Sequence, residues 1–238
     1  MRSNLLRMVA ACLPLAGLGA CGSTEGNTVS DMVGWIERVH VESELAKKNV
    51  QVTSEMMTAL VGNSVKGDPI AAYQEFTKAI SESESQANRL RAAVRQMQSA
   101  AQPVFDQWSS DLLKISNQQI RRRSDARMDA TLQRYQALLA ATKSAESGYD
   151  SFNQGVRDLS LFLGHDLNAT ALAEVRQDAR AITDLALELD GRFNRTLEAA
   201  RDYIASASLG GTTELRAAPP GGSHAEPQPA PQTTPARK

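Results

Sequence analysis

The sequence predicts an all-α fold: an elongated antiparallel helical bundle or coiled coil of about four long helices, followed by a disordered Pro-rich tail. Apolar and small residues recur at alternating spacings of three and four over most of residues 30–208, as in a coiled-coil seam. Strict polar–apolar alternation, which would indicate a half-buried strand, is absent, and helix-favouring residues dominate. Six of the nine prolines lie beyond residue 208, so the helical pattern ends there.

Residues 1–20 are predicted to be a lipoprotein signal peptide that is removed. Arg2 and Arg7 lie near its start, and the apolar run that follows is too short to cross a bilayer. Small residues directly before Cys21 resemble the lipobox of bacterial lipoproteins, in which the Cys becomes the first residue and carries the lipid. Gly22, where an Asp would favour inner-membrane retention, resembles the outer-membrane sorting signal. The alternative is an ordinary signal peptide with a chance Cys.

The cysteine count limits the chemistry of the mature chain. Cys12 is removed with the signal and Cys21 would be acylated, so no thiol nucleophile, disulfide or Cys-based metal site is expected. Two or three acyl chains on one Cys suffice for stable membrane attachment, and residues 21–29 are read as the acylated tether. Loss of Arg2 and Arg7 leaves 24 Lys and Arg against 27 Asp and Glu, a net charge of −3, which argues against a nucleic-acid partner.

The first two helices have clear start and stop signals. The first seam runs from Met32 to Leu60 and stops at a Gly-Asn pair. Asp68 is expected to cap the second helix, with Pro69 at its first position. The second seam runs from Tyr73 to Trp108, and its helix is expected to extend to Ile115. Pro103 within it predicts a kink rather than a break into two shorter helices, because the heptad phase continues across it.

The third and fourth helices complete the bundle domain, residues 30–208. Ser116 is expected to cap the third helix, whose seam contains a three-residue step, or stammer, between Thr142 and Ala145. The fourth seam is expected to run unbroken from Leu172 to Tyr203. The seams contain many Ala, Ser and Thr, which bury little apolar area, so both a monomer and a homo-oligomer remain open.

The bend between these two helices organises the prediction. Gly164 is expected to sit past the end of the third helix at positive φ, beside His165. Asn168 is expected to cap the fourth helix, with Leu167 and Leu172 at hydrophobic-staple spacing. The two helices must therefore lie side by side. Residues 209–238 form the Pro/Gly/Ala-rich tail, which cannot bury a core and is expected to be disordered.

Several residues match a known family pattern: Phe105, Trp108, Arg121, Ser124, Leu132, Tyr135, Ala145, Glu146, Asp158, Leu161, Phe162, Leu163, His165, Leu167, Asn168 and Ala169. By these residues the chain resembles a bacterial family catalogued as domain of unknown function 2959, over roughly Trp35–Ala207 and most clearly from Ser116 onward. The family has a Lys and an Asn where this chain has Gly164 and Asp166. The resemblance implies a helical, envelope-associated protein and brings no catalytic or binding residues.

No pattern in the sequence predicts a reaction. There is no Gly-rich phosphate loop, nucleophile elbow or HExxH motif. His40, His165 and His224 are isolated; His165 beside Asp166 is better read as a helix C-terminal partner than as a metal ligand. We therefore expect neither an enzyme nor a bound metal or cofactor.

Two features suggest contacts with the envelope. Arg121, Arg122, Arg123 and Arg127 form the one basic cluster, which would either contact anionic lipid or be a solvated helix end paired with nearby aspartates. The C-terminal Lys238 resembles the end of the major outer-membrane lipoprotein, whose last Lys is joined to peptidoglycan; the alternative is an unstructured end.

The sequence thus predicts a non-enzymatic lipoprotein, lipid-anchored at the outer membrane and facing the periplasm. It would act as a scaffold, spacer or adaptor for an envelope protein partner. One alternative is a lipid-binding or membrane-shaping helical module, and another is a peptidoglycan tether through Lys238.

Overall fold

The computed structural model describes residues 25–62 and 67–207. In this part of the chain every regular element is an α-helix, so the predicted all-α bundle is confirmed. The signal peptide, Cys21, His224, Lys238 and the tail lie outside the described residues. The five helices of the described ranges are α1 (Glu25–Val61), α2 (Pro69–Lys114), α3 (Gln118–His165), α4 (Ala169–Glu174) and α5 (Arg176–Ala207).

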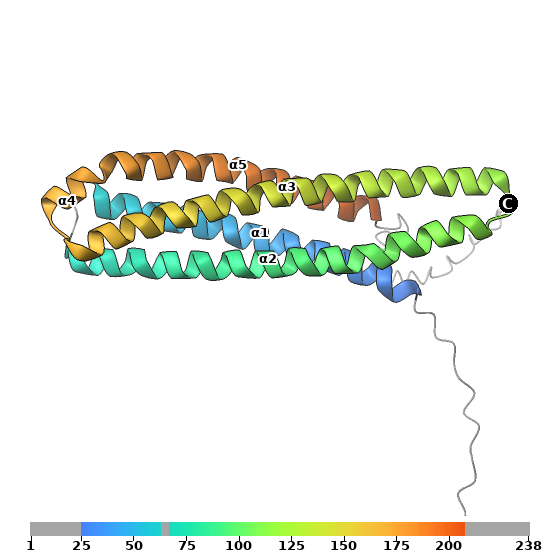
Figure 1. The fold of residues 1–238 in the computed structure, drawn as a ribbon, viewed down its shortest axis with the longest axis horizontal. Coiled ribbons are helices and arrows are strands. Elements are labelled where there is room, and N and C mark those ends of the chain that lie inside the picture. Colours follow the sequence, from blue (N-terminus) through green and yellow to red (C-terminus); the bar gives the residue numbers. More distant parts are fainter. Residues whose placement is uncertain (1–24, 63–66, 208–238) are drawn as a thin grey trace, which may run out of the picture.

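The four long helices form an antiparallel rod (Figure 1). α1 packs against α2 and α5, and α3 packs against the same two neighbours, which places α1 and α3 across the diagonal of the bundle. The apolar seam residues of all four helices meet in one core, whose largest fully buried side chains include Phe76, Tyr149, Phe152 and Phe193. The α3 residues on both sides of the predicted stammer, Thr142 and Ala145, are buried.

The helices differ in length, and this sets the shape of one end of the rod. α2 and α3 have 46 and 48 residues, whereas α1 and α5 have 37 and 32. The turn between α2 and α3 therefore projects beyond the start of α1 and the end of α5 (Figure 1). In this projecting hairpin the Trp108 indole N–H donates to the Ser124 hydroxyl at 3.0 Å. The ring centroids of Phe105 on α2 and Tyr135 on α3 lie 5.7 Å apart.

Small polar residues in the seams are buried with their hydroxyls satisfied. Ser43 donates to the carbonyl of Val39 at 2.7 Å, and Thr142 donates to that of Leu138 at 2.8 Å. Bonds of this kind within one helix let a hydroxyl enter the core without an unpaired polar group.

Two of the predicted helix caps are confirmed and one is wrong. The side chains of Asp68 and Asn168 accept hydrogen bonds from the first turns of α2 and α4. Asn117, and not Ser116, caps α3: its side-chain oxygen accepts from the backbone N–H groups of Gln119 and Ile120 at 3.0 and 3.2 Å. Both residue types suit this position, and the helix starts one residue later than the Ser would require.

The prediction for Gly164 is also wrong. α3 continues through Gly164 to His165, and the one described glycine with a positive φ is Gly67, at 106°. Gly164 serves close packing: a Cβ built there would lie 2.6 Å from the hydroxyl of Tyr73 on α2. That hydroxyl donates to the carbonyl of Ser160 at 3.0 Å, so the glycine leaves space for a contact between helices.

Of two possible helix interruptions, the structure differs from the sequence-based prediction at one, Val175, and agrees with it at the other, Pro103. The expected unbroken fourth helix is interrupted at Val175, which separates the short α4 from α5; its N–H still bonds to the carbonyl of Ala171 at 3.2 Å. By contrast, α2 continues through Pro103, as the unbroken heptad phase predicted.

Candidate functional site

The most distinctive surface of the rod is the end of the projecting hairpin, residues 112–124, which we call the hairpin tip. It consists of the last turn of α2, the three-residue turn 115–117 and the first two turns of α3. The Asn117 cap starts α3 directly after the turn. Leu113 is 83% exposed and Ile120 is 54% exposed, so the tip presents large apolar side chains to solvent.

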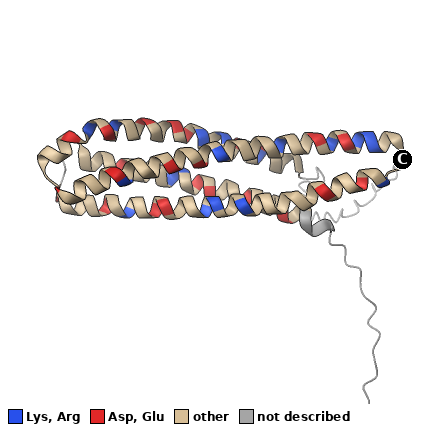
Figure 2. Cartoon of the chain, viewed as in Figure 1, with Lys and Arg blue, Asp and Glu red and all other residues tan. Residues whose placement is uncertain are grey.

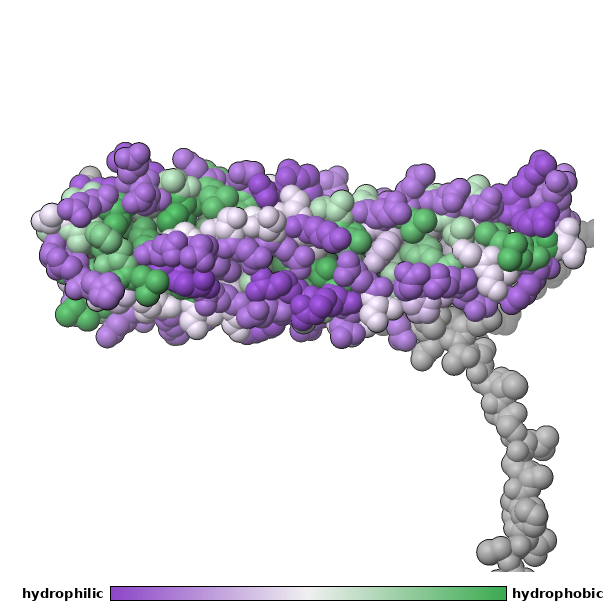
Figure 3. Space-filling model, viewed as in Figure 1, coloured by the Kyte–Doolittle hydropathy of each residue, from purple (hydrophilic) through white to green (hydrophobic). Residues whose placement is uncertain are grey.

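The hairpin tip is also basic. It contains Lys114 and the run Arg121, Arg122 and Arg123, and no acidic residue. Lys and Arg gather at the start of α3 in Figure 2, and Figure 3 shows apolar atoms beside hydrophilic ones at the same end of the rod.

The three arginines of the tip are exposed and, among the described residues, form no ion pair. The interpretation that nearby aspartates neutralise this cluster is therefore not supported by the geometry. Asp111 is occupied by Lys114: their side chains lie 2.7 Å apart, and hydrogen bonds from Lys114 and then Gln107 hold the pKa of Asp111 below its ordinary value. Arg127 is exposed as well, and lies one turn further along α3.

On the body of the rod, several arginines form ion pairs. Arg157 pairs with Glu84 and Arg91 with Asp150, joining α2 to α3. Arg192 pairs with Glu188 within α5 at 2.6 Å. Arg95, Arg180 and Arg195 of the body form no ion pair among the described residues either, so the tip differs in having three consecutive arginines and no acidic residue within residues 112–124.

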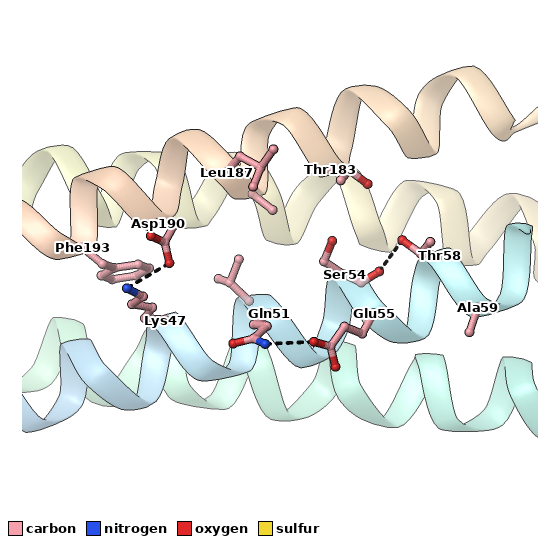
Figure 4. A pocket seen from close by; sticks show the side chains of 12 residues that line it. Lys47, Gln51, Ser54, Glu55, Thr58, Ala59, Thr183, Leu187, Asp190 and Phe193 are labelled. Atoms are coloured by element: carbon pink, nitrogen blue, oxygen red, sulfur yellow. Dashed lines mark hydrogen bonds and ion pairs between the residues drawn. The ribbon is translucent and has the colours of Figure 1, made fainter.

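A second surface feature is a groove between α1 and α5 with a volume of about 600 Å³ (Figure 4). Its floor is apolar, and its rim has an ion pair between Lys47 and Asp190 at 3.1 Å. Leu187, 69% exposed, stands on its α5 side. The residues around it are Lys47, Val50, Gln51, Ser54, Glu55, Thr58, Ala59, Thr183, Ala186, Leu187, Asp190 and Phe193. Sequence reasoning missed this groove, because it depends on the separation of two helices.

The histidines of the described chain lie apart. His40 on α1 accepts a hydrogen bond from Arg201 at 3.1 Å and lies 3.8 Å from Glu44. His165 is exposed in the last turn of α3, followed by the C-cap Asp166. Over residues 25–62 and 67–207, no group of three or more His, Cys, Asp or Glu side chains is placed to hold a metal ion.

Sequence reasoning also missed a buried carboxylate. Glu42 on α1 is 1% exposed; it pairs with Arg38 at 2.5 Å and accepts a hydrogen bond from Gln86 of α2 at 2.6 Å. The available signal was its position beside the seam residue Ser43, together with an Arg four residues earlier. These contacts satisfy the buried charge and join α1 to α2.

Among the described helices, none combines the length and apolar character needed to cross a bilayer.

A family model described as a protein of unknown function, DUF2959, matches residues 27–207. No match was found among curated proteins. Because the match spans the whole helical bundle, the chain belongs to the family of proteins of unknown function DUF2959.

Proposed function

We propose that the protein is a non-enzymatic lipoprotein of the outer membrane, attached through lipid on Cys21 and facing the periplasm. In this proposal the rod is a scaffold that holds an envelope partner at a set distance from the membrane. The observation that carries it is the closeness of a lipobox-like sequence to a long, rigid helix. α1 begins at Glu25, so three residues separate that helix from the proposed lipid site, Cys21.

The direction of the rod supports a role as spacer. α1 has 37 residues, so it extends about 55 Å at about 1.5 Å per residue from the proposed anchor. The opposite end of the rod, with the α1–α2 connection and α4, is the part that would lie furthest into the periplasm (Figure 1). Exposed Leu161 and Phe162 near that end offer an apolar surface to a partner protein or to a second copy of the chain.

The attachment is tested by replacing Cys21 with Ala and following the protein in membrane and soluble fractions of cells. The proposal predicts that the wild-type chain is recovered in the outer-membrane fraction and that the Cys21→Ala variant is absent from this fraction. Cys12→Ala is the matched control, because it removes a Cys within the signal and leaves the lipobox-like residues intact. If the Cys21→Ala variant fractionates with the outer membrane as wild type does, the proposal is wrong.

The scaffold role needs a second measurement. Crosslinking of the wild-type chain in cells, followed by mass spectrometry of the products, should identify a neighbouring envelope protein. Crosslinks only between copies of this chain would point to a self-assembling rod and would contradict the adaptor role.

A further inference from the structure

We propose that the hairpin tip, residues 112–124, is a contact surface for an anionic lipid membrane, namely the membrane that holds the chain through Cys21. The orientation argument rests on the proposed lipid anchor. The proposal adds that the rod touches its membrane at a second place, and that this contact sets the angle at which the rod stands.

The hairpin tip lies further along the rod than the start of α1. Ser30 of α1 and Gln96 of α2 border the same surface depression, so they lie at similar levels along the rod. From Gln96, α2 continues to Lys114, which adds about 27 Å at about 1.5 Å per residue. From Ser30, α1 extends back only to Glu25, about 8 Å. The tip therefore projects about 20 Å beyond the start of α1.

The second step is the length of the connection to the lipid. Residues 22–24 separate the start of α1 from the proposed acylation site, Cys21, and a fully extended chain from Cys21 to Glu25 spans at most about 14 Å. That reach is shorter than the projection of the tip. When the rod stands upright with its body in the periplasm, the tip meets the bilayer surface before the tether is fully extended.

Other orientations keep the tip near the membrane too. When the rod lies flat on the membrane, the tip is no further from the bilayer surface than the length of the tether, about 14 Å. An inverted rod would have to pass about 55 Å of its body through the bilayer, which its charged surface forbids. An anchored chain thus keeps the hairpin tip near the lipid head groups in each orientation that it can adopt.

The third step is the chemistry of the tip. Arg121, Arg122 and Arg123 are exposed and form no ion pair with any residue of the described helices, so they can contact lipid phosphates without first breaking such a pair. Guanidinium groups bind phosphate oxygens in a bidentate manner. Leu113 and Ile120 can enter the boundary between head groups and acyl chains, as the apolar residues of interfacial helices do.

The strength of this contact fits an auxiliary role. Each basic residue near an anionic surface contributes about 1 kcal/mol, so the three arginines contribute about 3 kcal/mol and give the free tip only a millimolar affinity for lipid. A short tether, however, supplies an effective concentration in the millimolar range. The contact is therefore expected to form in the anchored chain and to be weak in the free chain.

The test uses a chain that starts at Cys21, its sole thiol, coupled to a maleimide-bearing lipid in vesicles. This coupling reproduces the tether whether or not cells acylate Cys21, so failure of this proposal is distinguishable from failure of the lipoprotein proposal. A photo-crosslinking benzophenone amino acid replaces Leu113 at the tip. In the matched control it replaces Leu187, which is also highly exposed but lies on the body of α5.

On phosphatidylglycerol-containing vesicles, the reporter at Leu113 should crosslink to lipid at least about fivefold more than the reporter at Leu187. The combined change Arg121→Gln, Arg122→Gln and Arg123→Gln should lower this yield severalfold, as should vesicles of phosphatidylcholine alone or high salt. The combined change Arg95→Gln, Arg180→Gln and Arg195→Gln removes the same charge from the body and should leave the yield unchanged.

Three results would overturn the proposal. The first is equal crosslinking from the two reporter sites. The second is equal yield on neutral and anionic vesicles. The third is an equal loss from the tip and body arginine variants. Circular dichroism of each variant, compared with wild type, verifies that the helical fold is kept.

Discussion

Replacement of Tyr149 by Phe tests a buried hydrogen bond between α3 and α2. Tyr149 is 1% exposed, and its hydroxyl donates to the backbone carbonyl of Ser83 on α2 at 2.9 Å. The Ser83 hydroxyl lies 3.0 Å from that of Tyr149 and 2.7 Å from the side-chain oxygen of Asn153. The ring also makes an edge contact with Phe193, with centroids 5.6 Å apart, which Phe would preserve.

The difference in free energy of unfolding between wild type and Tyr149→Phe depends on pH. Near pH 8 the variant loses one interhelical hydrogen bond, and Ser83 keeps its bond to Asn153, so the free energy of unfolding should fall by about 1 kcal/mol. Burial raises the pKa of Tyr149 from 10.0 to about 12. Because the folded-state pKa is the higher one, this stabilisation of the fold is complete below pH 10 and is lost as the pH rises towards 12. The full loss is about 2.7 kcal/mol, and about half of it has occurred near pH 11.

Phe has no proton to lose, so the deficit of the Tyr149→Phe variant should disappear near pH 11. The assay is urea unfolding followed by far-ultraviolet circular dichroism, for both proteins at pH 8 and near pH 11. Tyr203→Phe should show the same trend, since burial also raises the pKa of Tyr203 to about 12. The reasoning is refuted if the gap between wild type and Tyr149→Phe is unchanged or larger at the higher pH.

Gly164→Ala should destabilise the fold by about 1–3 kcal/mol, because its Cβ would displace the Tyr73 hydroxyl; adding Tyr73→Phe should recover part of the loss. Gly34→Ala is the control, because a Cβ at Gly34 meets no atom within 4 Å. Since Ala favours the helix interior over Gly, thermal unfolding should show that the free energy of unfolding rises by about 0.5–1 kcal/mol. Equal effects at the two glycines would contradict the packing argument. Glu42→Ala should cost about 1–3 kcal/mol in urea unfolding by removing the side-chain partner of Gln86, and a neutral effect would mean that the buried pair contributes nothing.

The sequence predicts most features that a single helix determines, although it misplaces the cap of α3 by one residue and misses the interruption at Val175. The seam residues of α1 and α2, and the caps Asp68 and Asn168, follow from periodicity and from local hydrogen bonding, which operate within a few residues. The continuity of α2 through Pro103 was likewise readable from a heptad phase that persists on both sides.

Features that depend on the packing of two helices could not be predicted from the sequence. The sequence predicts a bend at Gly164, because the Tyr73 hydroxyl that Gly164 packs against lies on a helix far away in the sequence. The groove beside Leu187 depends on the separation of α1 from α5. The arginines of the tip were visible as a cluster, but their lack of ion pairs and their projection beyond α1 needed three dimensions.

The most direct test of the central claim is the mass of the first peptide of the mature chain, isolated from membranes. The account predicts that this peptide begins at Cys21 and carries a diacylglyceryl group on its sulfur. A peptide that begins at Cys21 with a free thiol, or a chain that begins at another residue, would contradict it.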